Sequence, residues 1–167
     1  MKELQSDTVS SPIGDIAVVA DGEDLVFLDF EDNQERKLTL LKRRFGEVTL
    51  NDERNVLGMR DRIARYFQGD REAFHGIKLS AGGTDFQRQV WQALCDIPWG
   101  QSISYDQLAR DIGNGSAIRA AASANARNPI SIIVPCHRVI GKNGSMRGYA
   151  GGVDRKVWLL RHEGALI

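Results

Sequence analysis

The chain has 167 residues, of which 42% are hydrophobic and 26% charged. This suits one ordinary domain or two small ones with a packed core, and no apolar run reaches the 18 residues of a membrane-spanning helix. Two cysteines and three scattered histidines give no pattern of zinc ligands. The N-terminus lacks the basic head and apolar body of a signal peptide, so we expect a cytoplasmic protein with reduced thiols and no membrane partner.

Charge is unevenly distributed along the chain, although the formal net charge is zero. Residues 1–35 hold ten acidic side chains and one basic one, whereas residues 119–161 hold eight basic side chains and one acidic one. Ordinary solvated helix faces would explain this asymmetry. A basic second half could equally carry a phosphate-binding surface, so both interpretations stay open.

The first part of the chain favours a small antiparallel sheet followed by helices. Runs rich in β-forming residues occur at 8–10, 16–19 and 25–28, with turn residues at 11–14 and 21–22 between them. The spacing of apolar residues then predicts helices over 35–45 and 55–67. Composition changes after Ala81-Gly82-Gly83, so we expect an N-terminal α/β domain over residues 1–80 and a mainly helical domain over 81–167. The predicted fold class is α+β.

Capping signals divide the second part into helices. Thr84-Asp85-Phe86-Gln87 is a capping box that should begin a helix whose buried side carries Phe86, Val90, Trp91 and Leu94. A second box, Ser104-Tyr105-Asp106-Gln107, predicts a short helix ending near Ile112-Gly113, and a third helix should follow over residues 117–126. Two helices joined by a short glycine-containing turn form the outline of a helix-turn-helix.

The third helix, "AIRAAASANA", is unusual for a reader of DNA bases. It offers methyl groups where a major-groove helix would present Arg, Asn or Gln, and Arg119 is the only long side chain of its first turn. Small residues allow close approach to a surface, whereas the alternative is a buried, alanine-rich core helix.

A thiol and an imidazole stand side by side in "IIVPCHRVI", residues 132–140. Pro135 cannot donate to a sheet ladder, so a strand over Ile130–Val134 should end as it reaches Cys136. A nearby imidazole favours the reactive thiolate. Sequence neighbours diverge in extended chain, so a bridging water would have to join Cys136 to His137.

That imidazole would need an orienting acceptor, and Glu163 at the end of the last predicted helix is a candidate. The alternative for a lone Cys-His pair is a buried structural thiol. Cys95, on the predicted helix with Trp91 and Leu94, fits that alternative better than Cys136 does.

Several motifs in one order resemble the O6-alkylguanine-DNA alkyltransferases, also called methylated-DNA-protein-cysteine methyltransferases. "PCHRV" (135–139) is preceded by "NPI" (128–130) and followed by "GYAGG" (148–152) and "WLLRHEG" (158–164). The resemblance is strong over residues 84–167 and weaker before them, where "SPIGDI" (11–16) matches. It implies a ribonuclease-H-like N-terminal domain with a structural role and a C-terminal domain that carries a winged-helix-like DNA-binding motif and the alkyl acceptor.

The resemblance also implies a function, which is repair of O6-alkylguanine, and of O4-alkylthymine, in double-stranded DNA. Such a protein binds the minor groove, flips the damaged nucleotide and moves its alkyl group irreversibly to its own cysteine, without a cofactor and without a metal. It would act as a monomer, with cooperativity on DNA left open. Because the alkyl group of a thioether is not easily displaced from sulfur, each molecule should react once.

Roles carry over from the family to matching positions. Cys136 matches the acceptor, His137 the water-bridged base, Glu163 the carboxylate that polarises it, Asn128 the support of the active-site turn, and Tyr105 a proton donor that also stacks near the DNA. Arg119 matches the residue that replaces the flipped base, with Ala120, Ser123 and Arg127 as further DNA contacts, and Pro135, Val139, Tyr149 and Ala150 match the guanine pocket.

Two positions depart from the family pattern. Many members read Arg-Ala-Val-Gly where this chain has Arg119-Ala120-Ala121-Ala122, and many carry a serine at the position of Ala150. These changes bear on the depth of the helix in the groove and on hydrogen bonding to the guanine oxygen. Two rival classes stay open: a Cys-His-Glu hydrolase or acyltransferase, which would turn over many times, and a helix-turn-helix regulator, which would not need Cys136.

Overall fold

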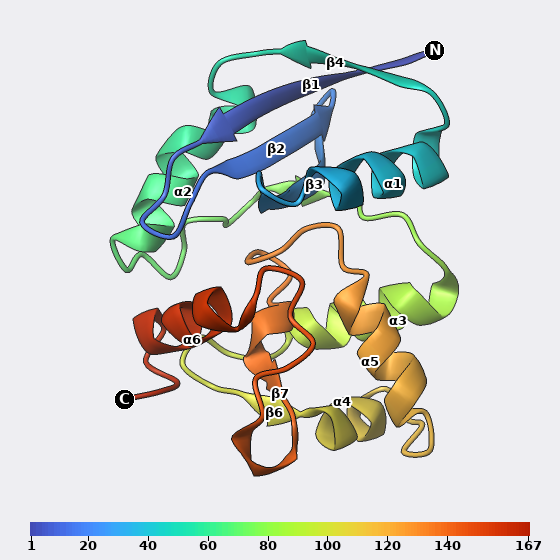
Figure 1. The fold of residues 1–167 in the computed structure, drawn as a ribbon, viewed down its shortest axis with the longest axis vertical. Coiled ribbons are helices and arrows are strands. Elements are labelled where there is room, and N and C mark those ends of the chain that lie inside the picture. Colours follow the sequence, from blue (N-terminus) through green and yellow to red (C-terminus); the bar gives the residue numbers. More distant parts are fainter. The chain divides into compact units, whose positions relative to one another are not determined.

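The chain divides after Gly82 into two units, Met1–Gly82 and Gly83–Ile167, in a computed structural model that describes all 167 residues (Figure 1). The α+β class expected from the sequence is confirmed, with a sheet in the first unit and mainly helices in the second. None of the helices is both long and apolar enough to cross a lipid bilayer.

The first unit is built on a five-stranded sheet in the order β4-β1-β2-β3-β5. Its strands are β1 (Lys2–Val9), β2 (Ile16–Asp21), β3 (Asp24–Phe30), β4 (Val48–Asp52) and β5 (Lys78–Leu79). The three strands expected from the sequence, β1 to β3, pair antiparallel as predicted, but β1 begins at Lys2, six residues before the run predicted at 8–10. The edge strands β4 and β5 were not predicted, and both pair in parallel with their neighbours.

Burial explains which strands the sequence reveals. Nearly every residue of β2 and β3 is buried, so these strands read as continuous apolar runs, whereas β4 is half-exposed and β5 has two exposed residues. The helix α1 (Gln34–Phe45) places Leu41 in a core with Leu4 and Phe27 of the sheet. This burial of large apolar side chains stabilises the unit.

The second predicted helix of this unit is shorter than expected. Helix α2 (Met59–Phe67) begins at Met59, and a separate 3-10 turn, η1 (Val56–Gly58), precedes it. Asn55, Leu57 and Gly58 all have positive φ, which an α-helix does not allow. The prediction of a continuous helix from residue 55 was therefore wrong.

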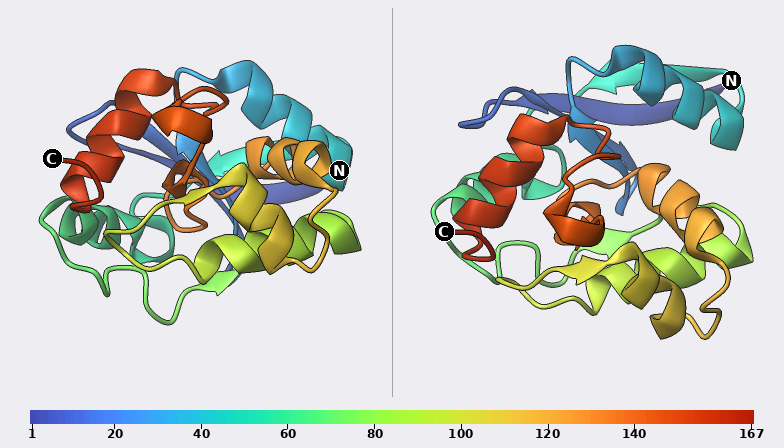
Figure 2. Two further views of the ribbon diagram at one scale, coloured as in Figure 1. Left: turned by 90° about the horizontal axis from the view of Figure 1, so that it is seen from below. Right: turned by 60° about the horizontal axis from the view of Figure 1, so that its bottom comes forward.

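The second unit is mainly helical. Its helices are α3 (Asp85–Cys95), α4 (Tyr105–Asp111), α5 (Ile118–Ala126) and α6 (Val153–His162); the 3-10 turns are η2 (Cys136–Arg138) and η3 (Lys142–Gly144); and β6 (Ile103–Ser104) pairs in parallel with β7 (Val139–Ile140). Helices α4 and α5 pack on each other and α5 packs on α3, as a helix-turn-helix requires. Figure 2 shows η2 lying between α6 and this group of helices.

The two predicted capping boxes differ in the structure. At α3 both bonds form, because Thr84 accepts from the Gln87 amide while the Gln87 side chain accepts from the Thr84 amide. At α4 only the Ser104 half forms, since the Gln107 side chain instead bonds Arg110 and Asp111 on its own helix. The second box is therefore a simple N-cap.

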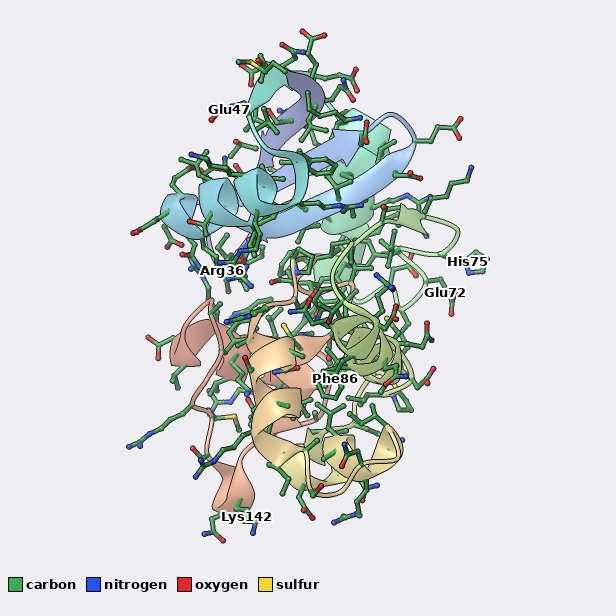
Figure 3. All side chains as sticks on the ribbon, turned by 90° about the vertical axis from the view of Figure 1, so that its right-hand side faces the viewer. Arg36, Glu47, Glu72, His75, Phe86 and Lys142 are labelled. Atoms are coloured by element: carbon green, nitrogen blue, oxygen red, sulfur yellow. The ribbon has the colours of Figure 1, made fainter.

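The predicted burial of Phe86 on α3 was also only partly right. Val90, Trp91 and Leu94 are buried, but Phe86, labelled in Figure 3, is partly exposed. Cys95 is exposed, so the interpretation of it as a buried structural thiol was wrong.

The predicted strand Ile130–Val134 does not form. The segment is a tight turn in which the Val134 amide donates to the Ile130 carbonyl at 3.1 Å, and Ile132 has a φ of 71°. The side chain of Asn128, 1% exposed, closes this turn because its Oδ1 accepts from the Ile130 amide at 2.9 Å and its Nδ2 donates to the Val134 carbonyl at 2.7 Å. A side chain thus satisfies backbone groups that a strand ladder would otherwise satisfy.

Candidate active site

Cys136 is the first residue of η2 and follows directly from the turn that Asn128 closes. The residue is 6% exposed, and its amide donates to the Val134 carbonyl at 2.8 Å. Its carbonyl lies 3.5 Å from Nδ2 of Asn125, a buried residue of α5. The turn therefore ties the thiol to the second helix of the helix-turn-helix.

Next to the thiol stands a buried chain of three side chains. His137 is fully buried, and its Nε2 lies 2.9 Å from Oε2 of Glu163, the C-cap of α6. Arg138 donates from Nε to Oε1 of the same carboxylate at 2.8 Å and from Nη2 to Oε2 at 3.0 Å. A third bond runs from Arg138 Nη1 to the Ile97 carbonyl at 2.7 Å. Glu163 is thus shared by an imidazole and a guanidinium.

These contacts fix the protonation of the pair. Burial alone raises the pKa of Glu163, but the bonds from His137 and Arg138 outweigh it and lower that pKa to about 2. Burial lowers the pKa of His137, and the positive charge of Arg138 adds to this effect. At neutral pH the carboxylate is therefore ionised and the imidazole neutral, with its proton on Nε2.

The other ring nitrogen of His137 is left as an acceptor. Nδ1 is buried and has no hydrogen-bond partner in the protein, so no direct bond joins it to the Cys136 thiol. The absence of a direct bond agrees with the expectation from the sequence. The imidazole can accept a proton from the thiol through one intervening water.

Tyr105 begins α4 and directs a half-buried phenol toward this region. Gly148 approaches it so closely that a Cβ on that glycine would lie 3.3 Å from the phenol oxygen. Burial, and then the charge on Cys136, raise the pKa of Tyr105, and the Asn125 side chain offsets part of that rise. The phenol is therefore protonated at neutral pH and can donate.

A buried lysine completes the surroundings of the thiol. Lys156, on α6, is fully buried, and its Nζ donates to the Val139 carbonyl at 2.5 Å. Its Nζ also lies 5.9 Å from the centre of the Tyr105 ring. Burial lowers the pKa of Lys156 to about 8, an effect that Cys136 partly offsets.

The four positions that the sequence assigned to the pocket have different surroundings. Pro135 and Val139 are buried on either side of η2. The ring of Tyr149 meets the His137 ring edge-on, with centroids 6.5 Å apart. Ala150 is exposed.

Helix α5 has one exposed and one buried face. Arg119, Ala120, Ser123 and Arg127 are exposed at helical spacing, whereas Ala121, Ala124 and Asn125 are buried against the rest of the unit. The predicted alternative of a wholly buried core helix is therefore wrong. The side chains of the exposed face are short, apart from those of Arg119 and Arg127.

Three residues near the thiol were missed by reasoning from the sequence. Arg138, Lys156 and Asn125 all contact the turn or the groups around it. Only Arg138, inside the "PCHRV" motif, had a sequence signal that could have singled it out. No group of three or more His, Cys, Asp or Glu side chains lies close enough to hold a metal ion.

Fold and site together define a class of protein, in which a sheet-based unit precedes a helix-turn-helix unit that carries a buried cysteine beside a His-Glu pair. Two family models match the chain, the ribonuclease-like domain of 6-O-methylguanine DNA methyltransferase over residues 6–81 and its DNA-binding domain over residues 85–165. The chain belongs to the 6-O-methylguanine DNA methyltransferase family.

Relatives and solved structures agree with this assignment. A methylated-DNA–protein-cysteine methyltransferase of Salmonella typhimurium is 44% identical and covers 100% of this chain and 99% of its own. One of Methanosarcina acetivorans is 41% identical over 93% of this chain and 95% of its own. The crystal structure of the Mycobacterium tuberculosis OGT in complex with DNA is 37% identical, covers 98% of this chain and 93% of its own, and has a TM-score of 0.79.

Proposed function

We propose that this protein repairs O6-alkylguanine in double-stranded DNA by moving the alkyl group to Cys136. The observation that carries the proposal is the buried thiol of Cys136 beside a neutral His137 that donates to Glu163. Family membership and the DNA complex of a relative support DNA as the partner. No cofactor is needed, because the protein supplies the nucleophile and DNA supplies the group that is transferred.

The transfer is a displacement at the alkyl carbon. The Cys136 thiol loses its proton through water to Nδ1 of His137, the sulfur–carbon bond forms, and the bond from that carbon to O6 breaks with its electron pair on the guanine. The guanine takes a proton in exchange, and Tyr105 is placed as its donor. Glu163 holds the tautomer of His137, and Asn128 holds the turn that presents the thiol.

The exposed face of α5 is the proposed DNA contact. Ala120 and Ser123 allow the helix to approach the minor groove closely, and Arg127 meets phosphate. A target atom inside a duplex must be flipped out, at a cost of a few kcal/mol, and Arg119 fills the vacated stack. The guanine pocket is formed by Pro135, Val139, Tyr149 and the backbone at Ala150.

Turnover and the roles of the two units follow from this chemistry. The thioether product has no leaving group that water can easily displace, so each molecule reacts once. Residues 81–167 supply DNA binding and the acceptor, while residues 1–80 have a structural role. The same repair is proposed for O4-alkylthymine, and a cytoplasmic location is proposed because a reactive thiol needs a reducing compartment.

Intact mass spectrometry tests the proposal directly. After mixing with an oligonucleotide duplex containing O6-methylguanine, the protein should gain the mass of one methyl group, and peptide mapping should place it on Cys136. Cys136→Ser should gain nothing, whereas Cys95→Ser should react like the parent. Turnover beyond one equivalent would favour a hydrolase, and DNA binding with no mass gain would favour a regulator.

A further inference from the structure

Trp91 joins helix α3 to the backbone of helix α5, which lies beside it in Figure 1. Its indole is buried, and Nε1 donates to the carbonyl of Ala124 at 2.8 Å. The same carbonyl accepts from the Arg127 amide at 3.2 Å, and that amide is shared with the carbonyl of Ser123 at 3.2 Å. The indole therefore provides the shorter of the two bonds to the Ala124 carbonyl.

The other end of the indole rests against the backbone at the start of α3. Gly83 precedes the N-cap Thr84, and a Cβ at Gly83 would lie 2.6 Å from both Cη2 and Cζ3 of the Trp91 ring. A side chain at this position would therefore displace the ring. Gly83 also has a φ of 82°, which favours glycine. The indole is thus held between the backbone of Gly83 and the carbonyl of Ala124.

The last turn of α5, which Trp91 contacts, carries two of the proposed DNA contacts. Ser123 and Arg127 are exposed, whereas Ala124 between them is buried. The carbonyl of Ala124 is one of the last four of the helix, which have no regular partner within it. No side chain caps the other end of α5, at Ala117. The bond from Trp91 therefore holds the helix at the end where Ser123 and Arg127 lie.

We propose that Trp91 is a positioning residue for DNA binding, because its indole holds the last turn of α5 in the arrangement that engages the duplex. Gly83 leaves the room that this indole needs. The role rests on the proposed function, which assigns the exposed face of α5 to DNA. Trp91 acts through α5 and not on the reacting atoms, since the turn that presents Cys136 is closed separately by Asn128.

Replacing Trp91 with phenylalanine keeps an aromatic ring in the core and removes the donor. The last turn of α5 then leaves its place in a fraction of the molecules, and the apparent dissociation constant for DNA rises as the competent fraction falls. The loss of one net hydrogen bond corresponds to a factor of about 3–10 in such an equilibrium. Saturating DNA selects the competent arrangement, so the maximal rate of transfer should not change.

The first experiment measures both quantities at one salt concentration. Binding to a fluorescently labelled, unmodified duplex is followed by anisotropy, and single-turnover methyl transfer is followed with the same duplex containing O6-methylguanine. In Trp91→Phe the dissociation constant and the DNA concentration at half-maximal rate should both rise about 3–10-fold, with the parent rate at saturation. Unchanged binding would overturn the proposal. A lower rate at saturating DNA would also overturn it, because Trp91 would then affect the chemistry.

Trp99→Phe is the matched control for this substitution. Trp99 is a partly buried tryptophan of the same unit, and it belongs to neither α3 nor α5. Trp99→Phe should therefore bind the duplex and transfer the methyl group like the parent. An equal loss of binding in both variants would show that any tryptophan of the unit matters and would refute a specific role for Trp91.

The second experiment leaves Trp91 in place, so the proposal can be tested even if Trp91→Phe does not fold. In Gly83→Ala the added methyl group displaces the indole, and binding to the duplex should weaken as in Trp91→Phe. Gly76→Ala is the control, because Gly76 has a φ of 80° and open space where its Cβ would lie. It bears a similar backbone cost without touching a ring and should bind like the parent. If Gly83→Ala bound DNA as tightly as Gly76→Ala, the proposal would be wrong.

Reaction of Cys136 with iodoacetamide, in a Cys95→Ser background, separates positioning from general loosening of the unit. Cys136 is buried, so a unit that opens more often would expose the thiol and react faster. Trp91→Phe and Gly83→Ala should react at the parent rate. Faster reaction in both would assign the weaker DNA binding to unfolding and would contradict a positioning role.

Repair and the role of Trp91 can fail separately. If the parent binds the duplex but transfers no methyl group, the proposed repair function fails, and weaker binding by Trp91→Phe still supports its positioning role. If methyl transfer occurs and Trp91→Phe binds the duplex like the parent, the proposed function stands and the positioning role fails.

Discussion

The turn that presents Cys136 depends on the side chain of one buried residue, Asn128. Replacing it with alanine leaves the Ile130 amide without its partner in a site that is 1% exposed, and it removes one of the two hydrogen bonds to the Val134 carbonyl, which keeps the Cys136 amide as a donor. An unsatisfied buried amide costs about 1–3 kcal/mol and a lost hydrogen bond about 0.5–1.5 kcal/mol, so Asn128→Ala should lower the free energy of unfolding by about 1.5–4.5 kcal/mol. This is a large part of the roughly 5–15 kcal/mol that stabilises a typical domain.

Urea unfolding followed by tryptophan fluorescence measures this loss in the correct unit. All three tryptophans, Trp91, Trp99 and Trp158, belong to the second unit. Asn114→Ala is the matched control, because the Asn114 side chain is exposed and makes a single hydrogen bond, which it accepts from the nearby Ser116 hydroxyl. The control should stay within about 0.5 kcal/mol of the parent. An Asn128→Ala protein equally close to the parent would show that other contacts hold the turn.

Three further substitutions test separate parts of the site. Glu163→Gln should lower the free energy of unfolding at neutral pH by about 3 kcal/mol, which is the contribution of the Glu163 pKa being depressed to about 2. The parent should lose this contribution as pH falls from about 4.5 to 2. If urea titrations gave the variant the same dependence on acid pH as the parent, they would contradict the argument. Arg119→Ala should slow methyl transfer from duplex DNA far more than it slows reaction with a free O6-alkylguanine base, since only the duplex has a flipped nucleotide whose place must be filled. An equal loss of rate with both substrates would mean that Arg119 acts in folding or in the pocket instead. Tyr105→Phe should slow single-turnover transfer at saturating DNA by up to roughly 100-fold, and a parent rate under those conditions would remove the phenol from proton delivery.

Local signals in the sequence were sufficient for the helices that position the site. The Thr84 capping box and the Ser104 N-cap predicted where α3 and α4 begin, because caps involve residues only three positions apart. On α5, helical spacing likewise places Ala120 and Ser123 on the exposed face and Ala121 and Ala124 on the buried face. The pairing of His137 with Glu163, 26 positions apart, was found because the chemistry of an imidazole next to a thiol demands an acceptor.

Features that depend on distant or side-chain-to-backbone contacts were not predicted. An apolar, β-branched run at 130–134 favours a strand, but the Asn128 side chain satisfies its backbone groups and a turn forms instead. Lys156 appears in sequence as an ordinary charged residue of a helix, and only the packing of α6 shows that it is buried. The parallel pairing of β4 with β1 was also missed, since it joins segments about 45 residues apart.

Arg138 explains why the proposed base can remain a base. A carboxylate bound only to an imidazole would raise the pKa of that imidazole and favour a histidine that is already protonated. Because Arg138 shares Glu163, and because both Arg138 and Lys156 repel a proton on His137, the ring stays neutral while Nε2 is still fixed by the carboxylate. The two cations thus oppose protonation of the ring in the resting protein, so that Nδ1 of His137 keeps the lone pair that accepts the proton of the Cys136 thiol through water.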